Sequence, residues 1–88
     1  MDSRVRISQV DWEWGLRVIT DRLNVNLLDE RKNMSWIGPH ETLGKITEEY
    51  HELIEAIHRN HTEHTREELI DIAICALKGI VSMNVNER

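Results

Sequence analysis

The chain has 88 residues and a formal net charge of -5, and these two properties already exclude some classes of protein. A single domain of this size, residues 1-88, buries a small share of its surface, so association with another subunit would relieve a marginal core. The acidic balance argues against a nucleic-acid polymer as partner, because such proteins present clustered lysine and arginine.

The sequence lacks an apolar run long enough to cross a bilayer, and residues 1-7 alternate charged and apolar side chains instead of resembling a signal peptide. We therefore expect a soluble, cytoplasmic protein with no membrane partner. Cys75 is the only cysteine, which excludes an internal disulfide. Its apolar neighbours in the sequence predict a small buried hydrophobe.

The apolar spacing is helical along the chain and predicts an all-α fold, a helical bundle of three main helices. The first helix is expected to begin near Ser8 or Asp11, either of which can cap it, and to continue to about Leu28. One of its faces carries Val10, Trp14, Val18 and Leu23. Residues 30-38 then look like a polar connection.

A second helix is predicted from Pro39 to about Arg59, since proline suits a first helical turn. At about 100° per residue, Glu49 and Glu52 lie on one flank of its apolar stripe and are expected to be half-buried. Glu48 and Glu55 point away from the stripe and are expected to be solvated. The stripe itself consists of Leu43, Ile46, Tyr50, Leu53, Ile54 and Ile57.

The third predicted helix begins near Thr65 and runs to about Met83. Apolar residues cover most of its circumference, which is typical of a helix that is buried on nearly all sides. Two other helices can hardly surround it, so we infer a homodimer or homotetramer whose subunits complete a four-helix-type core. The narrow polar strip of this helix consists of Glu68, Asp71, Lys78 and Ser82, and Cys75 and Gly79 lie between them.

Two groups of acidic residues stand at helical spacing, EEYHE at residues 48-52 and ELID at residues 68-71. If the second and third helices pack antiparallel, these carboxylates face one another and form an oxygen-only cage for a divalent cation. Four carboxylates on sheltered helix flanks would repel one another without such a cation.

Taken one at a time, the third-helix acids also have ordinary explanations. Glu68 fits a capping box in which its side chain returns to the backbone N-H of Thr65. Asp71 could simply pair with Lys78 or with an arginine elsewhere in the chain. A carboxylate on so apolar a helix needs some such partner, because burying an unpaired charge is costly.

The order EExxE, a spacer of about fifteen residues and then ExxD resembles the MazG-like nucleoside triphosphate pyrophosphohydrolases, an all-α family. The resemblance covers about Trp36 to Val81. It implies that Mg²⁺, for which Mn²⁺ can substitute, binds four acidic residues. These are Glu49, Glu52, Glu68 and Asp71.

The resemblance further implies hydrolysis of an ordinary or modified nucleoside triphosphate to the monophosphate and pyrophosphate. Bound ions would neutralise phosphate charge and activate a water for attack at the α-phosphorus, and Glu48 or Glu52 would orient that water. Lys45 and Lys78 flank the two motifs and are candidates for phosphate contacts. Pairing of these lysines with neighbouring acids is an equal alternative.

The three tryptophans supply surfaces on which a base can stack. Trp14 shares the apolar face of the first helix and is expected to lie in the core. Trp12 and Trp36 fall outside the clear stripes and are candidates for contact with the base, with a role at an interface as the alternative.

Two further alternatives stay open. His58, His61 and His64 recur every third residue and could bind zinc or nickel, but the turn expected near His61 favours a solvated loop. The protein could also be a catalytically weak or inactive module that binds metal or nucleotide or serves in assembly. The short segment after Met83 favours that hypothesis, whereas the complete set of four acids favours the enzyme.

Overall fold

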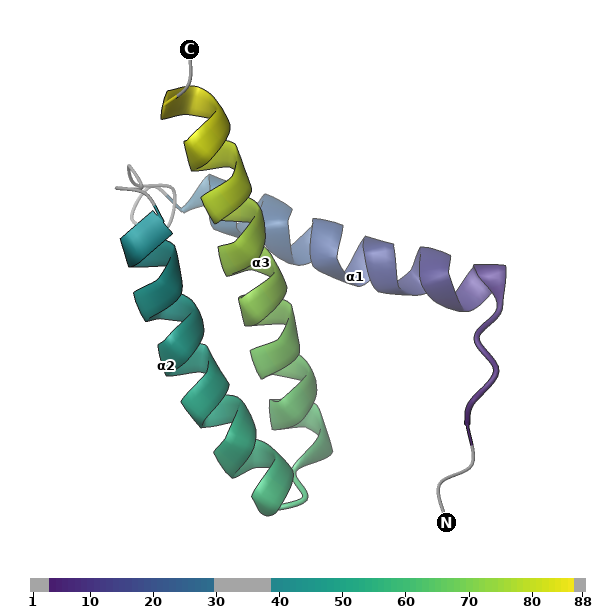
Figure 1. Ribbon diagram of the computed structural model, residues 1–88. Coiled ribbons are helices and arrows are strands. Elements are labelled where there is room, and N and C mark those ends of the chain that lie inside the picture. Colours follow the sequence, from purple (N-terminus) through teal and green to yellow (C-terminus); the bar gives the residue numbers. More distant parts are fainter. Residues whose placement is uncertain (1–3, 30–38, 87–88) are drawn as a thin grey trace.

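The computed structural model describes residues 4-29 and 39-86, and these residues form three α-helices and no strand (Figure 1). The helices are α1 (Gln9–Leu28), α2 (Pro39–His58) and α3 (Thr62–Asn86). The predicted all-α class and the order of three helices are confirmed. The connection predicted at residues 30-38, which includes Trp36, lies outside the described residues.

A capping box begins α1. The Ser8 hydroxyl accepts a hydrogen bond of 3.2 Å from the backbone N-H of Asp11, and the Asp11 carboxylate accepts one of 2.8 Å from the backbone N-H of Ser8. Both predicted capping residues therefore belong to one motif, which satisfies backbone donors that a helix start leaves without partners. The hydrogen bonds that the Asp11 carboxylate accepts, first from the Ser8 backbone N-H and then from the Ser8 hydroxyl, lower the pKa of Asp11.

α2 and α3 pack side by side and run in opposite directions, as the cation-cage hypothesis requires (Figure 1). Asn60 lies in the tight turn between them and has a φ of 56°, a left-handed conformation that asparagine tolerates better than most residues. The chain thus reverses within a few residues, and the acidic groups of the two helices are brought to facing positions.

The start of α3 differs from the prediction. The helix begins at Thr62, because the His61 ring caps it: Nδ1 accepts a hydrogen bond of 3.0 Å from the backbone N-H of His64. The predicted capping box between Thr65 and Glu68 is wrong. Thr65 lies inside the helix, where its hydroxyl donates to the His61 carbonyl at 2.8 Å.

The two hairpin helices approach each other closely at Gly79, which is buried. A Cβ at this position would lie 2.8 Å from both Oγ1 and Cγ2 of Thr42. One turn onward, the buried Ser82 hydroxyl donates a hydrogen bond of 2.9 Å to the Gly79 carbonyl. Gly79 therefore has a steric role in the contact between α2 and α3.

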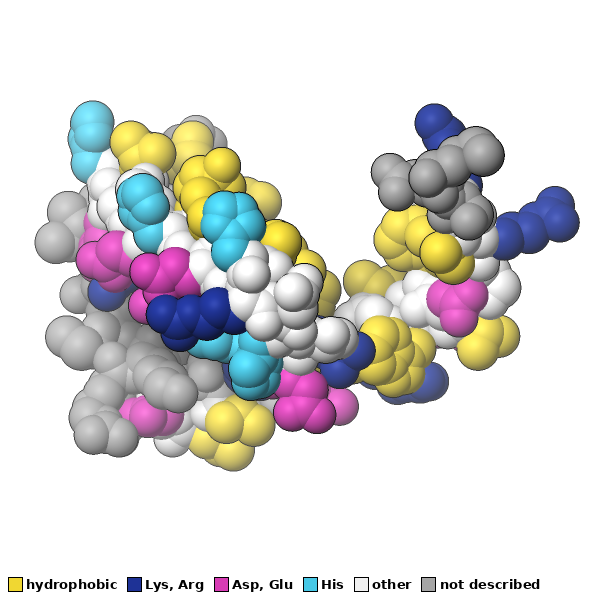
Figure 2. Space-filling model, turned by 90° about the horizontal axis from the view of Figure 1, so that it is seen from below, with side chains coloured by type: hydrophobic (Ala, Val, Ile, Leu, Met, Phe, Trp, Pro, Cys, Tyr) yellow, Lys and Arg dark blue, Asp and Glu magenta, His cyan; other side chains and the backbone are white. Residues whose placement is uncertain are grey.

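α1 packs on α3 and makes no comparable contact with α2 among the described residues. Its C-terminal half crosses the hairpin, whereas its N-terminal half extends away as an arm (Figures 1 and 2). Trp14 lies on this arm and is 52% exposed, so its predicted place in the core is wrong for the single chain. The apolar face predicted from the sequence is present, but none of the described helices covers Val10 and Trp14, whereas Val18 and Leu23 are half-buried.

The buried apolar core of the described residues is small and consists of Ala56, Ile70 and Ile74. α3 is not buried on nearly all sides as predicted: Leu69 is 52% exposed and Ile80 is 66% exposed. The α2 stripe is likewise covered on one side only, with Ile46, Leu53 and Ile54 half-buried and Leu43, Tyr50 and Ile57 exposed. None of the described helices is long and apolar enough to cross a membrane.

Substitution of Gly79 by alanine tests the close approach. Overpacking against the stiff, β-branched Thr42 costs about 1 to 3 kcal/mol, and the better helix propensity of alanine offsets about 1 kcal/mol of this. We expect Gly79→Ala to lower the free energy of unfolding by roughly 1 kcal/mol net, measured by urea unfolding followed by circular dichroism.

Gly44→Ala on α2 is the matched control. No atom lies within 4 Å of a Cβ at Gly44, so helix propensity alone should raise stability by up to about 1 kcal/mol. Equal stability of the two alanine variants would contradict the close approach at Gly79.

Candidate functional site

Three carboxylates of the hairpin lie close together between α2 and α3. One oxygen from each of Glu49, Glu68 and Asp71 lies within 4.8 Å of the other two. Glu49 comes from α2, and the other two stand three residues apart on α3, which places them on neighbouring positions of one helix surface. We call these three residues the acidic cluster.

Glu52 is the fourth cation ligand that the resemblance implies, and it does not belong to the acidic cluster. Glu52 is exposed, so the prediction that it is half-buried is wrong, whereas Glu48 and Glu55 are exposed as predicted. Glu52 is still near enough to affect Glu68. The hydrogen bond with Glu49 acts to lower the pKa of Glu68. Burial and the carboxylates of Glu52 and Asp71 act in the opposite direction, and the pKa of Glu68 is raised overall.

The electrostatics of the acidic cluster are those of like charges held together. A hydrogen bond with Glu68 raises the pKa of Glu49 to about 7, and burial and the neighbouring negative charges act in the same direction. Burial and then the charge of Glu49 raise the pKa of Asp71, against the opposing effect of Arg22. Near neutral pH the cluster therefore retains a proton that separated carboxylates would release.

When the carboxylates are ionised, two buried oxygens of the acidic cluster have no hydrogen-bond donor, Oε2 of Glu49 and Oε2 of Glu68. Glu68 as a whole is only 5% exposed. A buried carboxylate oxygen without a donor is unfavourable unless a proton or a cation lies beside it. An all-oxygen donor set of this kind suits a hard divalent cation such as Mg²⁺ or Mn²⁺.

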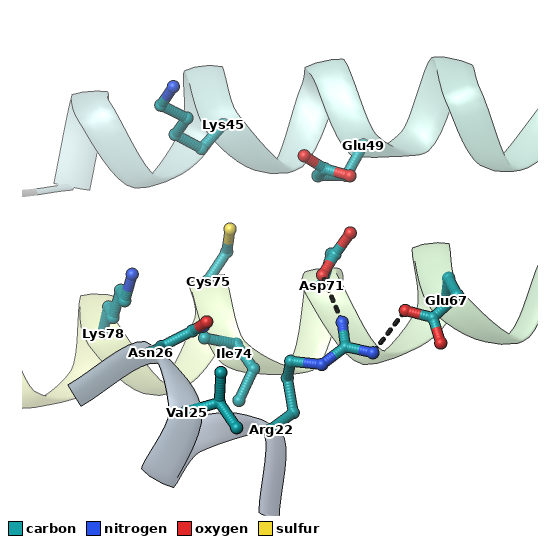
Figure 3. A pocket seen from close by; sticks show the side chains of 10 residues that line it. All are labelled: Arg22, Val25, Asn26, Lys45, Glu49, Glu67, Asp71, Ile74, Cys75 and Lys78. Carbon is teal, nitrogen blue, oxygen red and sulfur yellow. Dashed lines mark hydrogen bonds and ion pairs between the residues drawn. The ribbon is translucent and has the colours of Figure 1, made fainter. Parts of the chain in front are cut away.

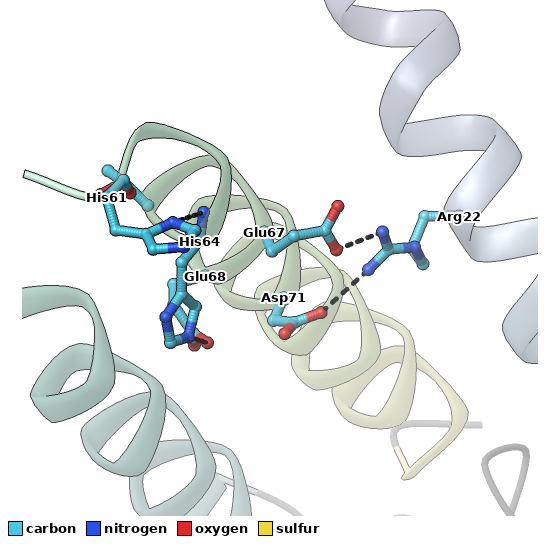
Figure 4. Close-up of polar contacts among 7 residues, drawn as sticks. Arg22, His61, His64, Glu67, Glu68 and Asp71 are labelled. Carbon is cyan, nitrogen blue, oxygen red and sulfur yellow. Dashed lines mark hydrogen bonds and ion pairs between the residues drawn. The ribbon is translucent and has the colours of Figure 1, made fainter. Parts of the chain in front are cut away.

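Two outer oxygens of the acidic cluster have basic partners that lie outside the two acidic motifs (Figure 4). His64 Nε2 lies 3.0 Å from Oε1 of Glu68. The Arg22 guanidinium on α1 contacts Oδ1 of Asp71 at 3.4 Å and also pairs with Glu67. Pairing with an arginine, one of the two alternatives left open for Asp71, is thus confirmed.

The two basic partners differ in whether the sequence spacing could have predicted their contacts. His64 and Glu68 stand at i and i+4 on one helix, so their contact was available from spacing alone. Arg22 lies 49 residues before Asp71, and no periodicity connects two helices across such a separation. The sequence offered no signal by which Arg22 could have been chosen among the other arginines.

A pocket of about 520 Å³ opens beside the acidic cluster, within the usual size range of small-molecule sites (Figure 3). Glu49 and Asp71 lie toward one end and Lys45 and Lys78 toward the other, with Cys75 between them. Its lining residues are Arg22, Val25, Asn26, Lys45, Glu49, Glu67, Asp71, Ile74, Cys75 and Lys78. The pocket therefore combines negative and positive ends, which suits a ligand that carries both a cation and an anion.

Cys75 and Lys45 differ in part from expectation. Cys75 was predicted to be buried but is half-buried in the pocket wall, where burial raises the pKa of its thiol. Lys45 Nζ lies 3.9 Å from Oε2 of Glu48, so its predicted alternative role as a salt-bridge partner is present. Exposed pairs of this kind contribute little to stability, and Lys45 can exchange Glu48 for another anion.

The remaining sequence candidates lie away from this pocket or outside the description. Trp12 is 60% exposed on the α1 arm and does not line the pocket, so within one chain it offers no surface for a base there. Trp36 lies outside the described residues. His58, His61 and His64 are exposed as expected, although His58 belongs to α2 and His64 to α3 instead of a loop. No histidine joins the acidic cluster found among the described residues.

Comparison with protein-family models, with curated proteins and with solved structures found no match for this chain. The function is therefore argued from the acidic cluster and from the pocket beside it.

The raised pKa of Glu49 predicts a pH dependence of stability. Between the ordinary value of 4.5 and about 7, the folded chain binds a proton at Glu49 that the unfolded chain has released. Stability from this group is complete below pH 4.5 and is lost as the pH rises through about 7. With a chelator present, the midpoint temperature of thermal unfolding should decrease as the pH is raised from about 5 to about 7.5.

Two variants assign this effect to the acidic cluster. Glu49→Gln removes the titrating group and should reduce the loss, whereas Glu55→Gln, at an exposed position of α2, should retain it. An unfolding midpoint that rises with pH over this interval would contradict the arrangement.

Proposed function

We propose that this chain is a divalent-cation-dependent hydrolase that converts a nucleoside triphosphate to the monophosphate and pyrophosphate. The observation that carries the proposal is the buried Glu68, whose Oε2 lacks a hydrogen-bond partner inside a group of three carboxylates. A cation would satisfy that oxygen and offset the mutual repulsion of the cluster. The resemblance of the two acidic motifs to the MazG-like family supports the same assignment.

In this proposal Glu49, Glu68 and Asp71 hold Mg²⁺, which when bound neutralises phosphate charge and lowers the pKa of a water molecule. Glu52 is exposed beside Glu68 and accepts the proton of the attacking water. Glu48 is less suited to this role, because it is exposed away from the cluster and pairs with Lys45.

The pocket supplies the remaining groups of the proposed reaction. Lys45 and Lys78 line it beyond the carboxylates and would contact the phosphate oxygens that the cation leaves free. Water would attack the α-phosphorus, and the bond from that phosphorus to the bridging oxygen of pyrophosphate would break. The lysines would then stabilise the negative charge that develops on the leaving group.

A second function is favoured by one specific observation. Arg22 already pairs with Asp71, so part of the cluster's charge is offset by the chain itself without a cation. A binding or assembly module that keeps the fold and the cluster but lacks turnover would use these groups to fix α1 on the hairpin. The exposed Trp12 on the free arm of α1 suits such a module as well.

We also propose that copies of the chain associate. The single chain exposes 7589 Å² of surface, whereas a folded monomer of 10.4 kDa exposes about 5,400 Å² by the usual scaling. The excess of roughly 2,000 Å² per chain is of the size that permanent interfaces bury. Exposed apolar side chains on every helix, among them Trp14, Tyr50 and Ile80, supply such an interface.

Turnover is tested with a panel of nucleoside triphosphates and Mg²⁺ or Mn²⁺, with pyrophosphate and orthophosphate measured separately. The wild-type chain should release pyrophosphate, and Glu68→Gln should lower kcat/KM by about 10²-fold or more, because a neutral amide holds the cation more weakly than a carboxylate and the positive charge at the reacting phosphate is lost with the cation. Asp71→Asn and Glu52→Gln should impair turnover too, and Glu55→Gln should not.

Absence of turnover with every nucleotide would exclude the enzyme. Binding of Mn²⁺ without turnover would then favour the binding or assembly module.

Association is tested by light scattering coupled to gel filtration. The wild-type chain should have at least twice the mass of one subunit, and Ile80→Asp should shift it toward the monomer, because a charge would enter an apolar interface. Glu55→Gln is the control and should leave the mass unchanged. A monomeric wild-type chain with the helix content of the structure would contradict the proposal.

A further inference from the structure

Arg22 links two helices that lie far apart in the sequence, α1 and α3. Its side chain leaves α1, is about one-third exposed, and pairs with Glu67 and Asp71 on α3 (Figure 4). Near this contact, Val25 and Asn26 of α1 and Ile74 of α3 line the same pocket (Figure 3). Arg22 is therefore a main polar anchor of α1 on the hairpin.

The guanidinium approaches Asp71 from the side of α1, opposite to the acidic cluster. One carboxylate oxygen, Oδ1, faces Arg22 at 3.4 Å, and the other points toward Glu49 on α2 (Figure 3). Arg22 thus does not occupy the place where a cation would meet the three carboxylates. It lies behind Asp71 and restrains the direction in which that carboxylate points.

The chemistry of arginine suits this task better than that of lysine. The planar guanidinium offers donors in a fixed fork, so it can contact two carboxylates in one defined orientation. The ammonium group of lysine has the same charge but no such plane. Without the fork, Asp71 would be repelled by Glu49 and Glu68 and would turn away from them.

We propose that Arg22 is a positioning residue of the acidic cluster, which couples the docking of α1 on α3 to the binding of a divalent cation. Arg22 holds Asp71 with one oxygen toward Glu49, and a cation on that oxygen holds Asp71 toward Arg22 in return. Because linkage is reciprocal, docked α1 strengthens cation binding and the cation stabilises docked α1 by the same factor. This inference rests on the proposed cation site.

The first experiment measures Mn²⁺ affinity of the full chain by electron paramagnetic resonance, without any substrate. Arg22→Lys keeps the charge, so it isolates the geometric effect from the repulsion between arginine and cation. We expect it to weaken Mn²⁺ binding by about 10- to 100-fold, as loss of a residue that orients a metal ligand usually does. Arg17→Lys, at an exposed position on the same helix, is the control and should bind Mn²⁺ as the wild type does.

The second experiment measures amide hydrogen exchange in the C-terminal half of α1, first in the wild-type chain and then in Arg22→Lys. Saturating Mn²⁺ should slow exchange there about 10-fold or more in the wild-type chain, by the same linkage. In Arg22→Lys the effect of Mn²⁺ on these amides should be much smaller.

The outcomes separate this inference from the proposed function. Equal Mn²⁺ affinity of the wild type and Arg22→Lys, or exchange in α1 that Mn²⁺ leaves unchanged, would overturn the coupling and leave the cation site in place. A wild-type chain that does not bind Mn²⁺ would overturn both.

Discussion

Repulsion among like charges at the interface of α2 and α3 is the constraint around which the described structure is arranged. Glu49, Glu68 and Asp71 point oxygens at one another where two helices pack, and two of these oxygens are buried without a donor. Such an arrangement is unfavourable on its own and persists only if other interactions offset it. The neighbouring groups can be understood as parts of that compensation.

The compensation comes from three sources. Below about pH 7 a proton at Glu49, hydrogen-bonded with Glu68, removes one charge. His64 contacts Oε1 of Glu68, and Arg22 contacts Oδ1 of Asp71. His64 and Arg22 contact the acidic cluster from outside, and the proton neutralises one carboxylate within it. None of the three places a positive charge in contact with all three carboxylates. A bound divalent cation would do what these partners do not, which is why the proposed function is centred there.

Burial of apolar side chains within the single chain is also incomplete. Among the described residues the buried apolar core is limited to Ala56, Ile70 and Ile74, and large apolar side chains remain exposed on each helix. The close approach at Gly79 brings α2 and α3 together. An association of copies, as proposed, would bury the exposed faces, and it would do so where the sequence had predicted a helix buried on nearly all sides.

Much of the fold was determined by the sequence alone, because its signals are local. Ser8 and Asp11 form the cap of α1, Pro39 begins α2, and the helical period places Glu49 on the flank that meets α3. A helical wheel fixes the direction of each side chain about its own axis. The facing of Glu49 with Glu68 and Asp71 needed one further assumption, antiparallel packing, and the turn at Asn60 supplies it.

Tertiary structure alone decided which flanks are covered and by what. Glu52 and Trp14 stand on the predicted faces but are exposed, because coverage depends on a neighbouring helix and not on the wheel. The His61 ring caps α3 at a point before the cap predicted at Thr65, so Thr65 lies inside the helix. Arg22 reaches Asp71 across 49 residues, a contact that exists only once α1 lies against α3.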